Sequence, residues 1–115
     1  MTYEKALESI RAEFDTRKEA AHCEIIKTGL TYDGCNGFCV ALYNDNERGI
    51  MLTDLGETKE IFDEVTEDEW RSIAEEAGCR FRNWRLERDY NGMDDVYAFI
   101  KLLDDISERF FDIDD

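Results

Sequence analysis

Residues 38–58 have the sequence FCVALYNDNERGIMLTDLGET, in which two short apolar runs flank a polar segment. In an extended strand, Phe38, Val40 and Leu42 share one face. Residues 44–49 are of types that tolerate positive φ and indicate a turn, and residues 50–53 form the second run. A further β-prone run at residues 22–28 precedes them. Together these runs predict an antiparallel meander.

Three segments around this meander have the apolar spacing of helices. Residues 2–20 place an apolar stripe along one side of a helix. Residues 66–69, with the sequence TEDE, form a capping box, and we expect the helix that it starts to close at Gly78. Residues 94–110 carry the strongest stripe. The stripe residues are Tyr3, Leu7, Ile10 and Phe14 in the first segment, Trp70, Ile73 and Ala77 in the second, and Val96, Phe99, Ile100, Leu103, Ile106 and Phe110 in the third.

The remaining segments complete the predicted architecture. Residues 79–90 indicate one long strand, and residues 57–62 indicate either a fourth strand of the meander or the approach to a helix. The expected fold is α+β, with a mainly antiparallel sheet made of the meander and one later strand, packed with N-terminal, middle and C-terminal helices. We expect the 115 residues to form a single acidic domain.

The chain is strongly acidic, with 29 Asp and Glu residues, 14 Lys and Arg residues and a formal net charge of -15. A field of this sign repels nucleic acids and anionic membranes and favours basic protein surfaces. The apolar runs are too short to span a bilayer, and the polar start does not resemble a signal peptide. We therefore predict a cytoplasmic protein with no direct nucleic-acid or membrane partner. The same charge also fits a domain that is acidic for solubility only.

Four cysteines, Cys23, Cys35, Cys39 and Cys79, are candidate metal ligands. Cys35 and Cys39 have the local spacing of zinc ligands, and nearby glycines allow the backbone to turn around a metal. Cys23 and Cys79 would join them if their strands end beside that loop, with His22 as a substitute ligand. A zinc site is one prediction, buried free thiols are another, and disulfide or redox chemistry is a third. An iron–sulfur cluster also accepts four thiolates, but nothing favours it over zinc.

Other residues offer further candidate chemistry. Asp54 lies in a tight turn, where it is either a catalytic or metal-binding carboxylate or, as we favour, a cap of that turn. His22 and a cysteine are the parts of a possible nucleophilic pair. Arginines crowd the 79–90 segment around Trp84, which suits nucleic acid, internal ion pairs or the acidic groups of a partner, and the negative net charge favours internal ion pairs over nucleic acid. These arginines are Arg80, Arg82, Arg85 and Arg88.

The sequence LTDLGET at residues 52–58, directly after a hairpin strand, resembles the Leu-Thr-Asp-x-Gly-x-Thr turn of a small uncharacterised domain found in bacteria and prophages. In that family a strand pair precedes the turn, and a short helix, a glycine, a strand and a closing apolar helix follow it. Residues 77–79 and 96–106 fit the later parts, so the likeness covers residues 22–110. The resemblance implies no assured activity, and the cysteines are not part of the family pattern.

The chain is also similar in style to anti-CRISPR proteins and other phage-encoded inhibitors. Such proteins often place carboxylates in a basic nucleic-acid-binding groove, as in Cas9. This likeness implies a non-enzymatic inhibitor, encoded by a phage or mobile element, that binds a basic protein surface such as that of a Cas effector in the host cytoplasm. Any zinc would then be structural, and a small metal- or thiol-dependent enzyme is the alternative. The expected partner-binding residues are Glu64, Glu67, Asp68, Asp104, Asp105, Glu108 and Asp112.

Overall fold

The sheet is built around the predicted hairpin. In the computed structural model, which describes residues 1–111, β3 (Val40–Asp45) and β4 (Gly49–Thr53) pair antiparallel with Leu42 opposite Leu52. β2 (Cys23–Lys27) pairs with the other edge of β3. The predicted meander is therefore confirmed.

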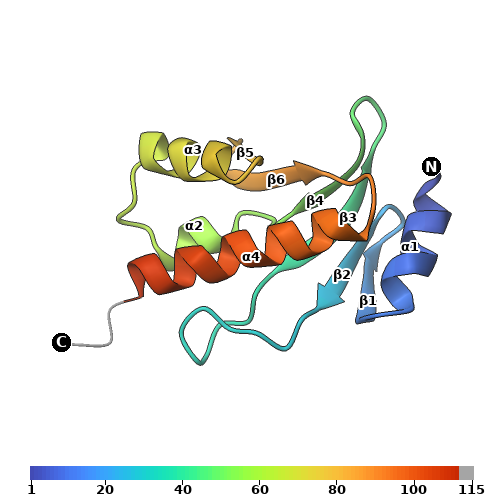
Figure 1. Ribbon diagram of the computed structural model, residues 1–115, viewed down its shortest axis with the longest axis horizontal. Helices are drawn as coiled ribbons and strands as arrows, with labels where there is room; N and C mark the ends of the chain where they lie inside the picture. The colour runs from blue at the N-terminus through green and yellow to red at the C-terminus, as the bar shows by residue number, and fades with distance from the viewer. Residues whose placement is uncertain (112–115) are drawn as a thin grey trace.

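Three further strands extend the sheet to six, all antiparallel, in the order β1-β2-β3-β4-β6-β5 (Figure 1). These strands are β1 (Asp15–Ala20), β5 (Arg80–Arg82) and β6 (Arg85–Asp89). The helices are α1 (Tyr3–Arg11), α2 (Glu57–Ile61), α3 (Glu67–Glu76) and α4 (Met93–Phe110). The fold is α+β with N-terminal, middle and C-terminal helices, as the sequence predicts.

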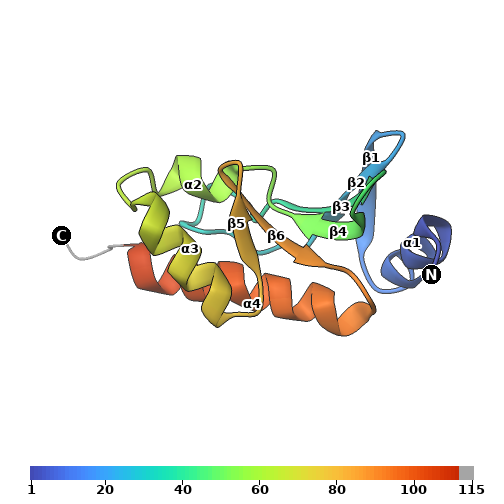
Figure 2. The ribbon, with the colours of Figure 1, turned by 90° about the horizontal axis from the view of Figure 1, so that it is seen from above.

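The helices α1 and α4 lie on the same side of the sheet, and no described helix lies over the opposite face of β3 and β4 (Figure 2). Leu42 and Leu52 are fully buried in the core on the helix side. At the other end of that core, Trp70 of α3 stacks on Phe81 of β5 with 6.0 Å between ring centroids. Phe110 of α4 also packs against Trp70. We call the face that no described helix covers the bare face of the sheet, although Met51 and Thr53 on that face are themselves buried.

The N-terminal helix is shorter than predicted, because residues 15–20 form β1. This segment has no large apolar side chain that a helix would bury, whereas as a strand its backbone pairs with β2. The buried Glu24 fixes the junction, since it accepts hydrogen bonds from Arg11 Nε at 2.8 Å and Thr16 Oγ1 at 2.6 Å. Burial alone would raise the pKa of Glu24, but these two donors lower the pKa below its ordinary value.

The single strand predicted over residues 79–90 is instead the hairpin of β5 and β6. Asn83 and Trp84 have φ values of 53° and 64°, in the left-handed region that a tight two-residue hairpin turn requires at both positions. The turn brings Arg82 directly opposite Arg85. The sequence does not signal this turn, because Trp84 occupies a position where glycine is the usual residue.

The two helices before this hairpin follow the sequence more closely. Residues 57–62, for which a strand or the approach to a helix was open, contain the short helix α2. The predicted capping box is present, because Thr66 Oγ1 accepts from the Glu69 amide and the Glu69 carboxylate accepts from the Thr66 amide. Gly78 follows α3 with φ 73°, as predicted. Among residues 1–111, no helix has the length and apolar character needed to cross a membrane.

Candidate functional site

The carboxylate of Asp54 anchors the turn between β4 and α2. It is 1% exposed, and its Oδ1 accepts hydrogen bonds from the amides of Gly56 and Leu86, each at 2.9 Å, while Oδ2 accepts from the Thr58 amide at 3.2 Å. Burial raises the pKa of this carboxyl group, and the hydrogen bonds oppose the rise. Asp54 caps the turn, as the sequence favoured, and it also ties the turn to β6. Because amides occupy both buried oxygens, the geometry gives it no route to a substrate.

The other residues of the motif serve the same anchor. Gly56 has φ 81°, and a Cβ there would lie 3.3 Å from the Trp84 carbonyl oxygen, so this close approach favours glycine. Thr58 is fully buried, and its hydroxyl lies 2.5 Å from the hydroxyl of Tyr32. Ser107 of α4 donates to the Tyr32 carbonyl oxygen at 2.5 Å. Asp54 and Thr58 of the LTDLGET motif therefore link β4 to β6 and to the loop before β3, and Tyr32 links that loop to α4. A role in folding accounts for the motif.

The structure does not bring the four predicted zinc ligands together. Cys23 is buried in β2, Cys35 is exposed in the loop before β3, Cys39 is half-buried at the start of β3, and Cys79 is buried after α3. All four are free thiols. Within residues 1–111, no group of three His, Cys, Asp or Glu side chains could hold a metal ion. The physical reason is the strand order, which separates β2 from β5 across the sheet while the exposed loop turns Cys35 toward solvent.

Three of the thiols also lack the lowered pKa of a nucleophile. Burial raises the pKa of Cys23 and Cys79, and it raises the pKa of Cys39 to about 12. Nucleophilic cysteines need the opposite shift, because the thiolate is the reactive form. His22 is exposed, packs edge-on against the Tyr3 ring at 6.5 Å, and has no hydrogen bond to a thiol among the described residues. The geometry therefore provides no support for a Cys–His pair.

Thiol labelling should separate the four cysteines by burial. We expect Cys35 to react fastest with an aromatic disulfide reagent, Cys39 more slowly, and Cys23 and Cys79 only when the protein unfolds. Replacement of Cys35 with serine should remove the fast phase, and a chelator should change none of the rates. A chelator that released additional reactive thiols from the native protein would contradict this arrangement and support a metal site.

Glu87 of β6 is the centre of an ion-pair cluster on the bare face of the sheet. It is 4% exposed and accepts from Arg48 Nη1 at 2.9 Å and from Arg80 Nε at 3.0 Å. Arg80 also donates to Asp89 at 3.0 Å. Two guanidinium groups therefore compensate one buried carboxylate, which is the arrangement that a buried charge requires.

The other arginines of the β5–β6 segment differ from one another. Arg88 pairs with Asp95 of α4 at 2.9 Å and also donates to the carbonyl oxygen of Ala77. The predicted internal pairing is thus confirmed for Arg80 and Arg88. Arg82 and Arg85 are exposed, and neither has an ion pair to a carboxylate among residues 1–111.

The described partner-binding candidates are all exposed, and they belong to elements that meet at one end of the molecule. In Figure 1 the beginning of α3 and the end of α4 are both at the end of the molecule opposite α1. Asp112 lies outside the described residues. We call the other predicted residues the acidic end: Glu64 just before α3, Glu67 and Asp68 in the first turn of α3, and Asp104, Asp105 and Glu108 on α4.

Few cations neutralise the acidic end. Arg71 pairs with Glu67 at 2.6 Å and with Asp68 at 3.4 Å, and Lys101 pairs with Asp105 at 3.4 Å. Exposed pairs of this kind contribute little to stability and exchange readily with solvent or another partner. Within the described residues, the remaining three carboxylates have no ion pair.

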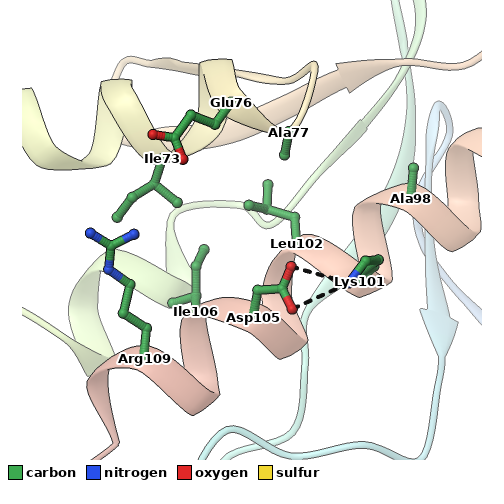
Figure 3. Close-up of a pocket in the computed structure, with 9 residues that line it drawn as sticks. All are labelled: Ile73, Glu76, Ala77, Ala98, Lys101, Leu102, Asp105, Ile106 and Arg109. Atoms are coloured by element: carbon green, nitrogen blue, oxygen red, sulfur yellow. Dashed lines mark hydrogen bonds and ion pairs between the residues drawn. The ribbon is translucent and has the colours of Figure 1, made fainter.

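A groove of about 400 Å³ lies between α3 and α4, beside the acidic end (Figure 3). Its apolar lining includes Ile73 of α3 and Leu102 and Ile106 of α4, and charged side chains form its rim. The rim residues are Glu76, Lys101, Asp105 and Arg109. The sequence could not reveal this groove, because it depends on how two helices far apart in the chain pack together.

No protein-family model matches the chain, and no curated protein or solved structure matches it either. The functional inference therefore depends on the geometry of the molecule and the charges on its surface.

Proposed function

We propose that this domain is a non-enzymatic interaction module whose acidic end binds a basic surface of a partner protein. The observation that carries the proposal is the uneven distribution of charge along the helices. Residues 57–76 contain nine carboxylates and only two basic side chains. The carboxylates are Glu57, Glu60, Asp63, Glu64, Glu67, Asp68, Glu69, Glu75 and Glu76, and the basic residues are Lys59 and Arg71.

The form of these charges suits a protein partner. Exposed carboxylates on helices that are fixed by a packed core keep their relative positions, so little order is lost when they bind. Lysine and arginine side chains donate charge-assisted hydrogen bonds to such carboxylates. The negative field also accelerates the encounter with a basic surface, and this effect weakens as salt screens the charges.

The proposed partner class is an enzyme that binds nucleic acid. The groove of such an enzyme carries lysines and arginines for phosphate groups, and a rigid set of carboxylates competes for the same donors. The likeness to phage-encoded inhibitors supports a Cas effector in the host cytoplasm as the specific target. For that target, addition of the protein to a Cas9–guide RNA complex should reduce DNA cleavage in proportion to the amount added. No inhibition by an excess would remove the Cas9 assignment.

Charge reversal tests the proposal with a defined probe, a fluorescein-labelled helical peptide rich in lysine and arginine. The double variant Asp104→Lys with Glu108→Lys should bind this peptide at least about tenfold more weakly by anisotropy, because it replaces attraction with repulsion at the proposed contact. Wild-type affinity should also fall as salt rises. The matched control is Glu4→Lys with Glu8→Lys on the exposed side of α1, which changes the net charge equally.

The control decides between a specific surface and general acidity. The proposal predicts that the α1 variant keeps most of the wild-type affinity. Equal loss in both double variants would show that only net charge matters, and the acidic end would then have no special role.

A further inference from the structure

We infer that the bare face of the β5–β6 hairpin is a second binding surface, which takes a short acidic segment of a partner protein. This inference is independent of the proposed function, since it concerns the opposite sign of charge and different elements. The surface consists of Arg82 and Arg85 and the neighbouring Tyr43 of β3, and Trp84 lies beside it at the tip of the hairpin. We call it the arginine face.

Arg82 and Arg85 form an unusual pair. They lie directly opposite each other in the register of β5 and β6, so their side chains leave the same face of the hairpin. Like charges in this position destabilise a strand pair. Both side chains are exposed without a carboxylate ion pair in the part of the chain that the structure describes. In contrast, six other arginines each have such a pair: Arg11, Arg17, Arg48, Arg71, Arg80 and Arg88.

The nearby carboxylates are already engaged. Glu87, on the same face of β6, accepts from both Arg48 and Arg80. Asp45 accepts from the backbone amides of Glu47 and Arg48 at 2.8 Å and 2.9 Å. Although the chain has an excess of acidic residues, none of the carboxylates that the structure describes pairs with Arg82 or Arg85. Both guanidinium groups are therefore available to the carboxylates of a partner.

Tyr43 adjoins the arginine face, and Trp84 lies at the tip of the hairpin beside it. Trp84 is 51% exposed, but its ring packs edge-on against Phe81 on the helix side with 5.9 Å between centroids, and the Lys59 ammonium group lies 4.6 Å from the centre of the ring. Tyr43 is 36% exposed and, with Arg85 and the buried Met51, lines a hollow of about 300 Å³ on the sheet. Tryptophan, tyrosine and arginine are the residue types that contribute most to protein interfaces. Most of the other residues that line the hollow are polar or charged, so it suits a small polar side chain of the bound segment. These residues are Asp45, Arg48, Thr53, Asn83 and Glu87.

The charges favour an acidic peptide over nucleic acid. A guanidinium group matches a carboxylate in a planar, two-bond arrangement, and two adjacent arginines match two acidic side chains. A nucleic-acid strand would extend beyond these arginines, toward the carboxylates of Asp45 and Asp89, on a molecule whose net charge is -15. A short segment meets less of that repulsion, because Asp45 and Glu87, the carboxylates that line the hollow, already accept from donors of the chain itself.

Trp84 fluorescence provides a direct test, because Trp70 is fully buried and only Trp84 meets a quencher in solution. Iodide should quench more strongly than caesium, and replacement of both arginines should reduce this preference to the part that the Lys59 ammonium group over the ring provides. A serine-containing peptide rich in Asp and Glu should protect Trp84, which is next to Arg85 in the chain, and bind with saturation. The double variant Arg82→Gln with Arg85→Gln should weaken that binding by about tenfold or more. The control variant Arg71→Gln with Lys101→Gln removes two exposed cations from helices and should bind normally.

Several outcomes would overturn the inference. An iodide preference that is unchanged in the hairpin variant would show that Lys59, and not the arginine face, makes the surroundings of Trp84 positive. Equal peptide binding by the hairpin variant and wild type would place the peptide elsewhere, provided that circular dichroism shows both to be folded. Tighter binding of oligothymidylate than of the peptide, lost in the hairpin variant, would assign the face to nucleic acid instead.

Discussion

Replacement of Asp54 with asparagine is expected to lower the free energy of unfolding by about 3 kcal/mol. Both carboxylate oxygens are acceptors for buried amides, two at Oδ1 and one at Oδ2. Asparagine has one oxygen and one donor group, so in either orientation its NH₂ group faces a backbone N–H and leaves it without an acceptor. Urea unfolding measures the change directly, and the midpoint of thermal unfolding should fall by roughly 10 °C or more.

A matched substitution at Asp33 separates the anchor from ordinary turn capping. Asp33 also accepts two backbone amides, those of Cys35 and Asn36, but it lies in the loop before β3 and outside the core. Asparagine is tolerated in such turns, so Asp33→Asn should change stability by no more than about 0.5 kcal/mol. If Asp54→Asn were equally mild, the turn would not depend on the buried carboxylate and the anchor described here would be wrong.

Replacement of Glu87 with glutamine is the second large effect that we expect, with a loss of about 2 kcal/mol in unfolding free energy. The neutral amide removes the shared buried charge between Arg48 and Arg80, which keep only Asp45 at 3.7 Å and Asp89 at 3.0 Å as their carboxylate partners. The loss falls below that of a fully buried pair, because the arginine side chains are 31% and 36% exposed and water solvates them in part.

Glu67 provides the control for Glu87. Its carboxylate is 2.6 Å from Arg71, but both side chains are nearly half exposed. Glu67→Gln should therefore have almost no effect on unfolding in urea. A similar loss for the two glutamine variants would show that burial of Glu87 does not determine the strength of its cluster.

Local patterns predict the parts of this fold that depend on neighbours in the chain. The hairpin of β3 and β4, the capping box of α3 and the stripe of α4 follow from alternation, capping and helical spacing. The exposure of the acidic residues of α4 follows from the same stripe, because these residues lie on the opposite side of the helix. The internal pairing of Arg80 and Arg88 follows from the excess of carboxylates.

The parts that the sequence misses depend on contacts between distant residues. β1 forms because β2 offers a free edge and a buried Glu24, which no property of residues 15–20 reveals. The donors to the Asp54 carboxylate include the Leu86 amide, 32 residues further along the chain. The spacing of Cys35 and Cys39 suggests a metal site, but the positions of Cys23 and Cys79 depend on strand order. Spacing predicts local geometry and does not predict whether distant ligands converge.

The two surfaces of this domain have opposite charge and lie on different elements. The acidic end is formed by α3 and α4, whereas the arginine face belongs to the β5–β6 hairpin and the bare side of the sheet. The anchor at Asp54 and the cluster at Glu87 hold these elements in place, so losses at either site should act on folding before they act on binding.

Nuclear magnetic resonance mapping tests the central claim about the acidic end most directly. Isotope-labelled protein is titrated with the lysine- and arginine-rich peptide at low salt, and the shift of each backbone amide is followed. We predict that the largest shifts fall at residues 63–68 and 104–110, and that they diminish as salt is added. Shifts of similar size at all exposed carboxylates, including Glu4 and Glu8 of α1, would contradict the claim and leave the acidity as a property of solubility alone.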